Sequence, residues 1–344
     1  MSLRIQTLTA ENAGAWDRFV RATPEATMFH LSGWKRVIEE AFGHATYFTF
    51  AEQDGAVVGV LPLAHMKSLL FGDALVSTPF CVYGGPVAVT PEANNALIEH
   101  AQDLLRSLGT PSLEFRHLHP PGQGWPERGA LYTTFRKAMS GQPEADMAAI
   151  PRKQRAMVRK GIQNGLTSIS DHDTDRLHAI YAQSVHKLGT PVFPRRYFRL
   201  LGEVFRAESD VVTVLHEDQP IAAVLNFHFR DEVLPYYGGG TRAARAVAGN
   251  DFMYWEVMRR AGSERGARIF DFGRSKTGTG AYAFKQHWGF TPQTLHYAYQ
   301  LRPGARLAEH NPTNPKYKLM ISAWRRLPLR LANLLGPPIV RGLG

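Results

Sequence analysis

The stretch that decides the fold begins Val233-Leu234-Pro235-Tyr236-Tyr237-Gly238-Gly239-Gly240, an apolar strand pattern that runs into three glycines. A helical pattern from Asn250 to Arg265 follows and stops at Gly266, and the next strand reads Arg268-Ile269-Phe270-Asp271-Phe272. A strand, a crossover helix and a second strand predict two parallel strands in one sheet. Val211–Leu215 and Ile221–Phe229 predict an antiparallel hairpin that precedes them in the same sheet.

The first half of the chain predicts the same order of elements. Strands at Thr46–Ala51 and Ala56–Leu63 flank an Asp-Gly turn, which favours a hairpin. A helix capped by Thr90 ends at Gly109, and a strand follows at once. Corresponding points lie 164, 159 and 156 residues apart, measured from Gly59 to Ala223, Pro91 to Asn250 and Ser112 to Arg268. These offsets indicate a duplicated α/β unit, with a chance recurrence of ordinary α/β order as the alternative.

Turn residues set the expected boundaries. Ser140-Gly141-Gln142-Pro143 interrupts two structured stretches, and a proline-rich linker follows Arg302. We therefore predict a first domain over 1–142, a second over 143–302 and a basic tail over 303–344. The element order in each domain is typical of the GNAT-like acyltransferase fold, an α/β (α+β) architecture with mixed sheets and crossover helices. In that fold two neighbouring strands splay apart and leave backbone amides free to hold an acyl donor.

Composition narrows the partners. The 344 residues are 44% hydrophobic and carry 40 basic against 30 acidic side chains, a net charge of +10. This excess favours anionic partners such as nucleic acid, nucleotide-linked substrates, acyl-CoA or an acidic membrane surface. One cysteine, Cys81, excludes a disulfide framework and multi-cysteine zinc sites, and its apolar neighbours predict a packed thiol. The histidines form no recognisable metal set, and without a signal or membrane-spanning pattern we expect a cytoplasmic protein.

A glycine-rich loop at 273–280 leads from the strand ending in Asp271 to a short helical turn that bears Lys285. Such a loop lets backbone amides approach a phosphate or carbonyl, although a tight connection that needs positive φ angles is an equal alternative. The spacing Gly273 to Gly278 resembles a P-loop, but Thr279 occupies the place of the required lysine. The loop therefore does not predict a nucleoside triphosphatase.

Two segments carry a specific resemblance. Asp271-Phe272-Gly273 followed by Phe284-Lys285-Gln286-His287-Trp288-Gly289-Phe290 resembles the closing signature of the FemAB family, and the similarity extends to 151–161, 236–240 and 251–255. More narrowly, the chain is similar to the FemAB-like subgroup associated with exosortase and PEP-CTERM exopolysaccharide systems. The family consists of tandem GNAT-like transferases that add amino acids from aminoacyl-tRNA to peptidoglycan precursors. The helical-hairpin insertion that contacts tRNA in some members is absent here, so acyl-CoA is an alternative donor.

The resemblance implies roles for three catalytic candidates. It places Lys285 near the reacting carbonyl, where a fixed cation stabilises the oxyanion of a tetrahedral intermediate. Asp271 would orient the amine or accept its proton, or it caps the following loop. Tyr237 would donate a hydrogen bond to the acceptor, or it belongs to the core. The alternative for Lys285 is a solvated helix charge.

The remaining candidates would bind substrates. Phe284 and Trp288 would form apolar walls. In GNAT proteins the donor pyrophosphate lies at the loop before the crossover helix, which here carries Arg242, Arg245 and Asn250. Further candidates for donor or substrate binding are Gly239, Arg274, Lys35, and Arg155 on the basic run 151–160. Each charged residue has a solvated surface role as its alternative.

The sequence thus predicts an acyltransferase that forms an amide by direct aminolysis of an acyl or aminoacyl donor, with no metal or bound cofactor. The acceptor would be a cell-envelope, peptidoglycan-type or exopolysaccharide precursor. The basic, Trp-bearing segment 316–335 either contacts the inner face of a membrane or braces the domains. The alternatives are an RNA-binding protein and a membrane-peripheral scaffold of polysaccharide export, neither of them catalytic.

Overall fold

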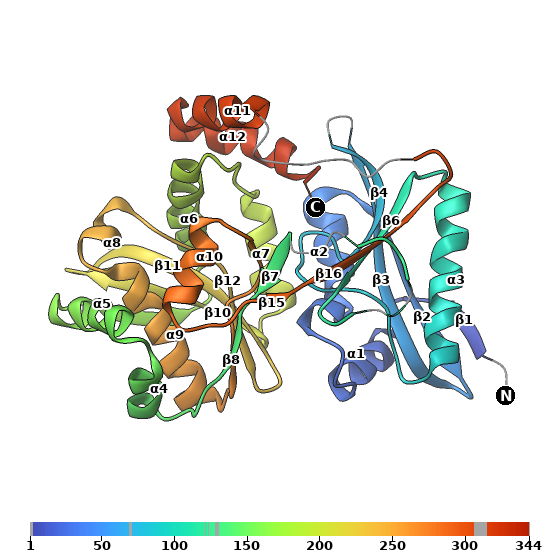
Figure 1. Cartoon of the computed structure of the whole chain (residues 1–344), viewed down its shortest axis with the longest axis horizontal. Coiled ribbons are helices and arrows are strands. Elements are labelled where there is room, and N and C mark those ends of the chain that lie inside the picture. The colour runs from blue at the N-terminus through green and yellow to red at the C-terminus, as the bar shows by residue number, and fades with distance from the viewer. Residues whose placement is uncertain are drawn as a thin grey trace. The chain divides into compact units, whose positions relative to one another are not determined.

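The computed structural model describes residues 3–68, 71–120, 122, 124–127, 131–305 and 315–343. The chain forms two compact units, each with its own sheet (Figure 1). The first comprises 1–131, 294–310 and 341–344, and the second comprises 132–293 and 311–340. The boundary at 142 that the sequence suggested therefore differs from the observed one, and the tail from 303 does not form a unit of its own.

Strand pairing explains this difference. β8 (Arg136–Ala138) precedes the turn at Ser140 but pairs with β13 (Ile269–Asp271), so it belongs to the second sheet. β16 (His296–Leu301) follows the second sheet in sequence but pairs with β6 (Ser112–His117) of the first. Such long-range pairings are not visible in local turn signals.

The first unit has a mixed sheet in the order β1-β2-β3-β4-β6-β16, with β5 paired to β3. Its remaining strands are β1 (Leu3–Thr7), β2 (Ala45–Gln53), β3 (Ala56–Ser68), β4 (Gly72–Ser77) and β5 (Val87–Ala88), and its helices are α1 (Ala13–Ala22), η1 (Met28–His30), α2 (Gly33–Phe42) and α3 (Pro91–Leu108). The Thr90 hydroxyl accepts from the backbone N–H of Ala93, and Gly109 ends α3 at φ 70°. The predicted caps of α3 are confirmed.

The second unit has a mixed sheet in the order β8-β13-β12-β11-β10-β9. Its other strands are β9 (Thr167–Asp171), β10 (Ser209–His216), β11 (Gln219–Phe229) and β12 (Glu232–Gly240), and a small sheet joins β14 (Ser275–Lys276), β7 (Tyr132–Thr134) and β15 (Gln293–Thr294). Its helices are α4 (Pro143–Ala149), α5 (Arg152–Gln163), α6 (Thr174–Leu188), α7 (Arg195–Val204), α8 (Arg242–Ala246), α9 (Gly249–Arg265), α10 (Gly280–His287), α11 (Pro315–Arg326) and α12 (Leu329–Val340). The predicted hairpin and crossover helix are confirmed.

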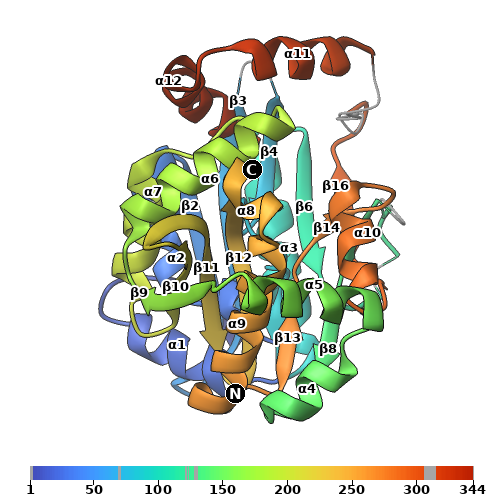
Figure 2. The same ribbon diagram turned by 90° about the vertical axis from the view of Figure 1, so that its left-hand side faces the viewer.

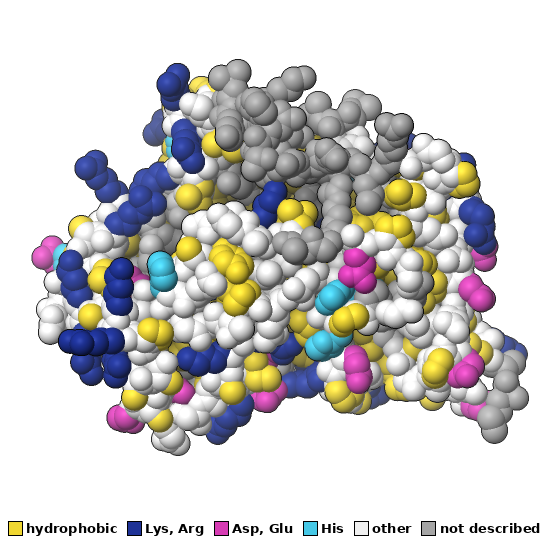
Figure 3. All heavy atoms as spheres, in the orientation of Figure 1, with side chains coloured by type: hydrophobic (Ala, Val, Ile, Leu, Met, Phe, Trp, Pro, Cys, Tyr) yellow, Lys and Arg dark blue, Asp and Glu magenta, His cyan; other side chains and the backbone are white. Residues whose placement is uncertain are grey.

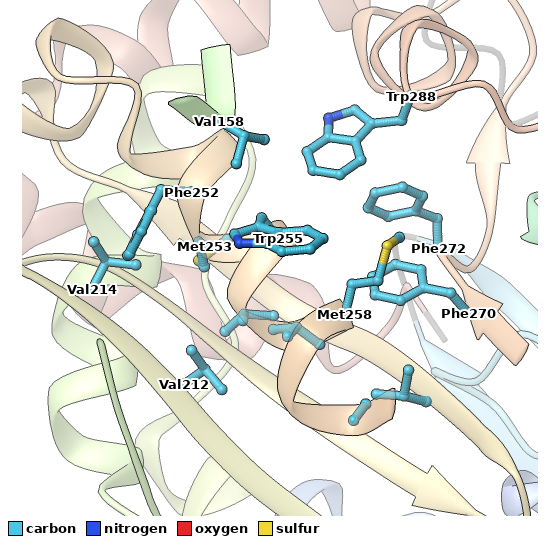
Figure 4. Packing of buried hydrophobic residues seen from close by; sticks show 14 of the residues in the cluster. Val158, Val212, Val214, Phe252, Met253, Trp255, Met258, Phe270, Phe272 and Trp288 are labelled. Atoms are coloured by element: carbon cyan, nitrogen blue, oxygen red, sulfur yellow. The ribbon is translucent and has the colours of Figure 1, made fainter. Parts of the chain in front are cut away.

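Helices cover both faces of the second sheet (Figure 2). α9 packs on the face that carries Val212, Val214 and Val224, and its Trp255 lies inside that core. Tyr237 on β12 pairs with Leu225, the residue after Val224, and its ring packs on Tyr181 of α6, so the opposite face of the sheet is covered by α6. Figure 4 shows Trp288 and Phe272 pointing into the α9 core beside Met258, so the segment that follows β13 is anchored by aromatic packing.

In each unit the two parallel strands of the βαβ element are joined by only two residue pairs. In the second unit β12 and β13 are parallel over two residue pairs, Glu232 with Ile269 and Val233 with Phe270, while β12 continues to Gly240. In the first unit β4 and β6 are likewise parallel over two pairs. The predicted parallel arrangement is confirmed, and pairing that ends early is the splayed geometry of this fold.

None of the helices within the described ranges combines the length and the apolar character needed to cross a bilayer.

Candidate active site

Lys285 is buried at the end of β13. Its side chain comes from α10, which the Thr279 hydroxyl caps by accepting from the backbone N–H of Tyr282. The ammonium donates to the carbonyls of Gly273 at 2.8 Å and Arg274 at 3.2 Å and lies 5.5 Å from the centre of the Phe135 ring. Only 9% of the residue is exposed. The alternative of a solvated helix charge is therefore excluded for Lys285.

Burial changes the acid–base behaviour of this lysine. Loss of hydration lowers the pKa of Lys285 from its ordinary value to about 7, against the raising effect of Asp271, and Arg274 lowers this pKa further. The ammonium has three N–H donors, and the described structure uses two of them on carbonyls. One donor is left for a further oxygen.

Asp271 is fully buried, and its carboxylate forms hydrogen bonds within the protein. Its carboxylate accepts from the Thr134 hydroxyl at 3.0 Å and from the backbone N–H of Gly273 at 2.7 Å. The Arg136 guanidinium lies 3.8 Å from it. Of the two roles considered for Asp271, the structure supports capping of the loop, because no part of the carboxylate is accessible to an incoming amine.

A second, half-buried acid lies beside Asp271. Glu232, the first residue of β12, forms an ion pair with Arg136. Burial and the neighbouring Asp271 carboxylate raise the pKa of Glu232 to about 8, and Arg136 opposes this shift. The sequence analysis missed Glu232 and Arg136, although a charged residue in the first position of an otherwise apolar strand was a visible signal.

The aromatic residues near Lys285 differ in burial. Trp288 is 1% exposed and packs against Phe272 and Tyr254, so it is a core residue rather than a wall of an open groove. Phe284 is half-buried and packs on the same two rings. Arg274 is also half-buried, with its guanidinium 4.8 Å from the centre of the Tyr132 ring. Phe284 is therefore partly exposed next to Lys285, whereas Arg274 packs on the Tyr132 ring.

A basic cluster lies at the start of the crossover helix. Arg242 and Arg245 are exposed on α8, directly before α9. Loss of hydration lowers the pKa of the exposed Lys187, and repulsion from Arg245 and Arg242 lowers this pKa further, so the three cations affect one another electrostatically. Lys187 comes from α6 and was not predicted, because nothing in its local sequence links it to α8. Figure 3 shows dark-blue side chains gathered where Figure 1 places α5 and α8.

Asn250 lies in the first turn of α9 against the end of β12. A Cβ on Gly240 would lie 2.3 Å from its Oδ1 atom and 2.9 Å from Cβ of Ala244, so the two segments approach closely at this glycine. The Oδ1 atom is buried and has no hydrogen-bond partner in the described part of the chain. Because this atom is enclosed where β12 meets α9, it does not present an acceptor to a ligand, and Asn250 acts in packing there.

Two predicted residues lie on the opposite face of the sheet. The Tyr237 hydroxyl forms a 3.0 Å hydrogen bond with that of Tyr197 and its ring packs on Tyr181, which supports the core alternative for Tyr237. A Cβ on Gly239 would lie 2.4 Å from Cβ of Ser184 on α6. Gly239 therefore permits close packing of α6 on β12.

The last two candidates are separate from these groups. Arg155 lies with Arg152 and Arg159 along one side of α5, where a surface hollow of about 490 Å³ is lined by these arginines. Lys35 belongs to α2 of the first unit, where it forms an ion pair with Glu39 and donates to the Thr46 hydroxyl at 3.0 Å. Lys35 has local partners that account for its position.

In the first unit the chain itself fills the place where the strands diverge. The backbone N–H groups of Gly84 and Gly85 both donate to the carbonyl of Arg116 on β6 at 3.0 Å. The Arg116 guanidinium donates to the carbonyl of Cys81, which is fully buried, as predicted for a packed thiol. The hydrogen bonds of Gly84 and Gly85 thus occupy backbone groups beside β6 that would otherwise be open to a ligand.

Over the described ranges no three His, Cys, Asp or Glu side chains gather in a way that could hold a metal ion.

Comparisons with known proteins agree with this architecture. Residues 151–286 match the family model described as an acetyltransferase (GNAT) domain, a range that starts just before α5 and ends one residue after Lys285. None of the curated protein sequences matches the chain.

Three solved structures share the fold over most of their length. A structure described as FemX is 15% identical, with a TM-score of 0.67 over 86% of this chain and 97% of that one. The C-terminal domain (DUF2156) of a putative lysylphosphatidylglycerol synthetase from Agrobacterium fabrum is 13% identical, with a TM-score of 0.57 over 86% and 93%. A tandem GNAT protein from the clavulanic acid biosynthesis pathway is 14% identical, with a TM-score of 0.53 over 87% and 98%. At these identities the likeness shows the fold, and the predicted FemAB-like tandem GNAT architecture is confirmed.

Proposed function

From the premise that this chain is a tandem GNAT-fold protein with an acyltransferase domain in its second unit, we propose that this unit forms an amide by direct aminolysis. A primary amine attacks the carbonyl carbon of an acyl thioester of the acyl-CoA class. The C–N bond forms, the C–S bond breaks, and the proton lost by the amine leaves with the thiol. An aminoacyl ester donor would react in the same way, with a hydroxyl as leaving group.

The observation that carries this proposal is the position of the Lys285 ammonium. The ammonium is buried, is held in place by two carbonyls and keeps one N–H donor unused. It can therefore stabilise the negative charge that develops on a carbonyl oxygen without a rearrangement of the side chain. Phe284 and the Phe135 ring lower the local dielectric around that charge. Asp271 acts through the loop, because it accepts from the N–H of Gly273, the residue whose carbonyl positions Lys285.

The basic cluster would hold the donor phosphates. Arg242, Arg245 and Lys187 supply three cations beside the first turn of α9, whose backbone N–H groups favour an anion. Donor phosphates here and the reacting carbonyl near Lys285 would place the donor along the end of β12.

We propose an anionic cell-envelope or exopolysaccharide precursor as the class of acceptor. The net charge of +10 and the arginines along α5 suit an anionic substrate. FemX and the lysylphosphatidylglycerol synthetase domain share the fold, and the family resemblance of 284–290 points to peptidoglycan precursors. Membership of the exosortase-associated subgroup remains a prediction.

One assay tests the reaction directly. Cys81 is the sole cysteine and is buried, so a thiol reagent will detect CoA release with little background from the folded protein. The full chain is incubated with a panel of acyl-CoAs and amine acceptors, and products are identified by mass spectrometry. We expect amine-dependent thiol release together with the matching amide.

Parallel incubations use aminoacyl-tRNA, and thermal shift measures binding of each donor. If only aminoacyl-tRNA is turned over, the donor is an aminoacyl ester and not an acyl-CoA, and the proposed aminolysis still holds. Absence of any donor-induced stabilisation, together with tight and strongly salt-dependent binding of generic RNA, would replace the enzyme by the RNA-binding alternative.

A further inference from the structure

The C-terminal helix pair has an unusual charge pattern. Between residues 315 and 344 the sequence has six basic residues and no acidic one; the basic residues are Lys316, Lys318, Arg325, Arg326, Arg330 and Arg341. Arg325, Arg326 and Arg330 are exposed. The segment therefore carries a concentrated positive charge, because it has no acidic residue that could neutralise the basic ones.

α12 has two apolar faces. One face, formed by Ala332, Gly336 and Val340 at intervals of four residues, is buried. A Cβ on Gly336 would lie 2.9 Å from the backbone nitrogen of Val192, so this face packs closely on the segment after α6. α12 therefore packs against the second unit, as the bracing alternative for the tail predicts, and only one side of the helix takes part in this packing.

The other face of α12 is an exposed leucine stripe. Leu331, Leu334 and Leu335 are 47%, 70% and 47% exposed, and their spacing of three and four residues places them on one side, away from the buried face. A helix of a water-soluble domain normally turns such a stripe towards a core. Here the stripe faces away from the unit on which the helix packs.

Exposed apolar side chains concentrate in this region. Nine large hydrophobic residues are exposed in the described structure, and five of them lie between 320 and 343. Leu188, also exposed, is adjacent, since its carbonyl accepts from the Arg325 guanidinium at 3.1 Å. Where Figure 1 places the described part of α11 and α12, Figure 3 shows dark-blue beside yellow side chains. An apolar patch bordered by one sign of charge marks an interaction surface.

We propose that this helix pair docks on an anionic lipid bilayer. Leu331, Leu334 and Leu335 enter the boundary between headgroups and acyl chains, while Arg326 and Arg330 contact lipid phosphates. Nucleic acid would use the arginines but not the leucines. A second copy of the chain would bring two uniformly basic segments together, which like-charge repulsion opposes. The charge and the stripe together fit an anionic membrane surface.

Vesicle co-sedimentation of the full chain tests this proposal. Vesicles of phosphatidylcholine alone are compared with vesicles that also contain phosphatidylglycerol. The wild-type protein should bind the anionic vesicles, and added salt should weaken this binding. The triple variant Leu331→Ser, Leu334→Ser, Leu335→Ser should bind about tenfold more weakly or worse, because each lost leucine removes buried apolar area.

A matched triple variant controls for loss of surface hydrophobicity. Val89→Ser, Ile162→Ser, Ile169→Ser replaces three other exposed apolar residues and should bind like the wild type. A charge variant, Arg326→Gln, Arg330→Gln, should weaken binding to anionic vesicles about thirtyfold, at roughly 1 kcal/mol for each of the two charges. Melting temperatures of all variants show whether they are folded.

Three results would overturn the proposal. The first is absence of wild-type binding to anionic vesicles at low salt. The second is unchanged binding of a folded leucine triple variant. The third is a concentration-dependent dimer that the leucine variant abolishes while vesicle binding persists. Acyl transfer to a soluble amine does not depend on this surface, so the leucine variant should retain it.

Discussion

The ammonium of Lys285 donates a 2.8 Å hydrogen bond to the carbonyl of Gly273, twelve residues earlier in the chain. The N–H of the same glycine donates to Asp271 at 2.7 Å. A buried carboxylate at the end of β13 therefore holds one side of Gly273, and the other side of the same residue holds the cation. This link gives the glycine-rich loop a defined function, which is to hold a buried charge at the place where two strands diverge.

Lys285 should make folding stability depend on pH. Its pKa is lowered to about 7 in the folded chain, against its ordinary value of 10.5. Between these values the unfolded chain binds more protons, so the free energy of unfolding of the wild type should rise with pH from about 7 to 10, by at most about 1.4 kcal/mol per pH unit. Urea unfolding at pH 7 and pH 9 measures this, with Lys285→Met as the reference. Equal pH dependence in both proteins would show that this lysine is not the source.

Glu232 should act in the opposite direction. Burial and Asp271 raise the pKa of Glu232 to about 8 from 4.5, so the folded chain binds the extra proton between these values. Its contribution to stability is present below about pH 4.5 and is lost as the pH rises through about 8. Glu232→Gln, which mimics the protonated form, should therefore become more stable relative to the wild type as the pH rises from 5 to 8. A constant difference across this range would contradict the assignment.

The basic cluster should affect donor affinity more than turnover. Arg242→Glu should raise KM for an acyl-CoA about tenfold at low salt with a small effect on kcat, since an exposed cation steers and binds phosphates. Arg4→Glu, an exposed change of the same charge in the first unit, is the control and should leave KM unchanged. If KM rises equally in both variants, the effect comes from the change in net charge and not from the position of Arg242.

Gly239 should be required for packing and not for chemistry. Gly239→Ala places a Cβ about 2.4 Å from Cβ of Ser184, and should lower the free energy of unfolding by roughly 1–3 kcal/mol. Adding Ser184→Gly should restore much of this loss. Gly280→Ala, where a Cβ meets no atom within 4 Å, is the matched control and should cost little. If Gly239→Ala keeps full stability and loses donor binding, Gly239 belongs to the donor site.

Most of the fold was predictable because local signals agree with it. The Thr90 cap, the glycines that end α3 and α9, and the Asp-Gly hairpin all act over a few residues, and all lie where expected. The domain boundary was not predictable. β8 and β16 each join a sheet through pairings with residues far away in sequence, Ile269–Asp271 and Ser112–His117 respectively.

The site was predictable where a motif set it. The motif around Lys285 led to a buried and fixed lysine, and the loop before α9 led to Arg242 and Arg245. Residues recruited by tertiary packing were missed, namely Lys187 from α6 and the Glu232–Arg136 ion pair. Tyr237 and Gly239 were predicted as site residues but pack against α6. The alternation of side chains along β12 turns them to that face, and the sequence alone did not show that α6 covers it.

The central claim is that the Lys285 ammonium stabilises the developing oxyanion in the second unit. Thiol release from acyl-CoA in the presence of an amine acceptor tests it, with Lys285→Met compared to Lys67→Met, which replaces an exposed lysine on β3 of the first unit. Lys285→Met should lower kcat about 100-fold to 1,000-fold without lowering the melting temperature, because methionine fills the buried position without an ionic group. Lys67→Met should remain fully active. A folded Lys285→Met protein that turns over at the wild-type rate would contradict the account.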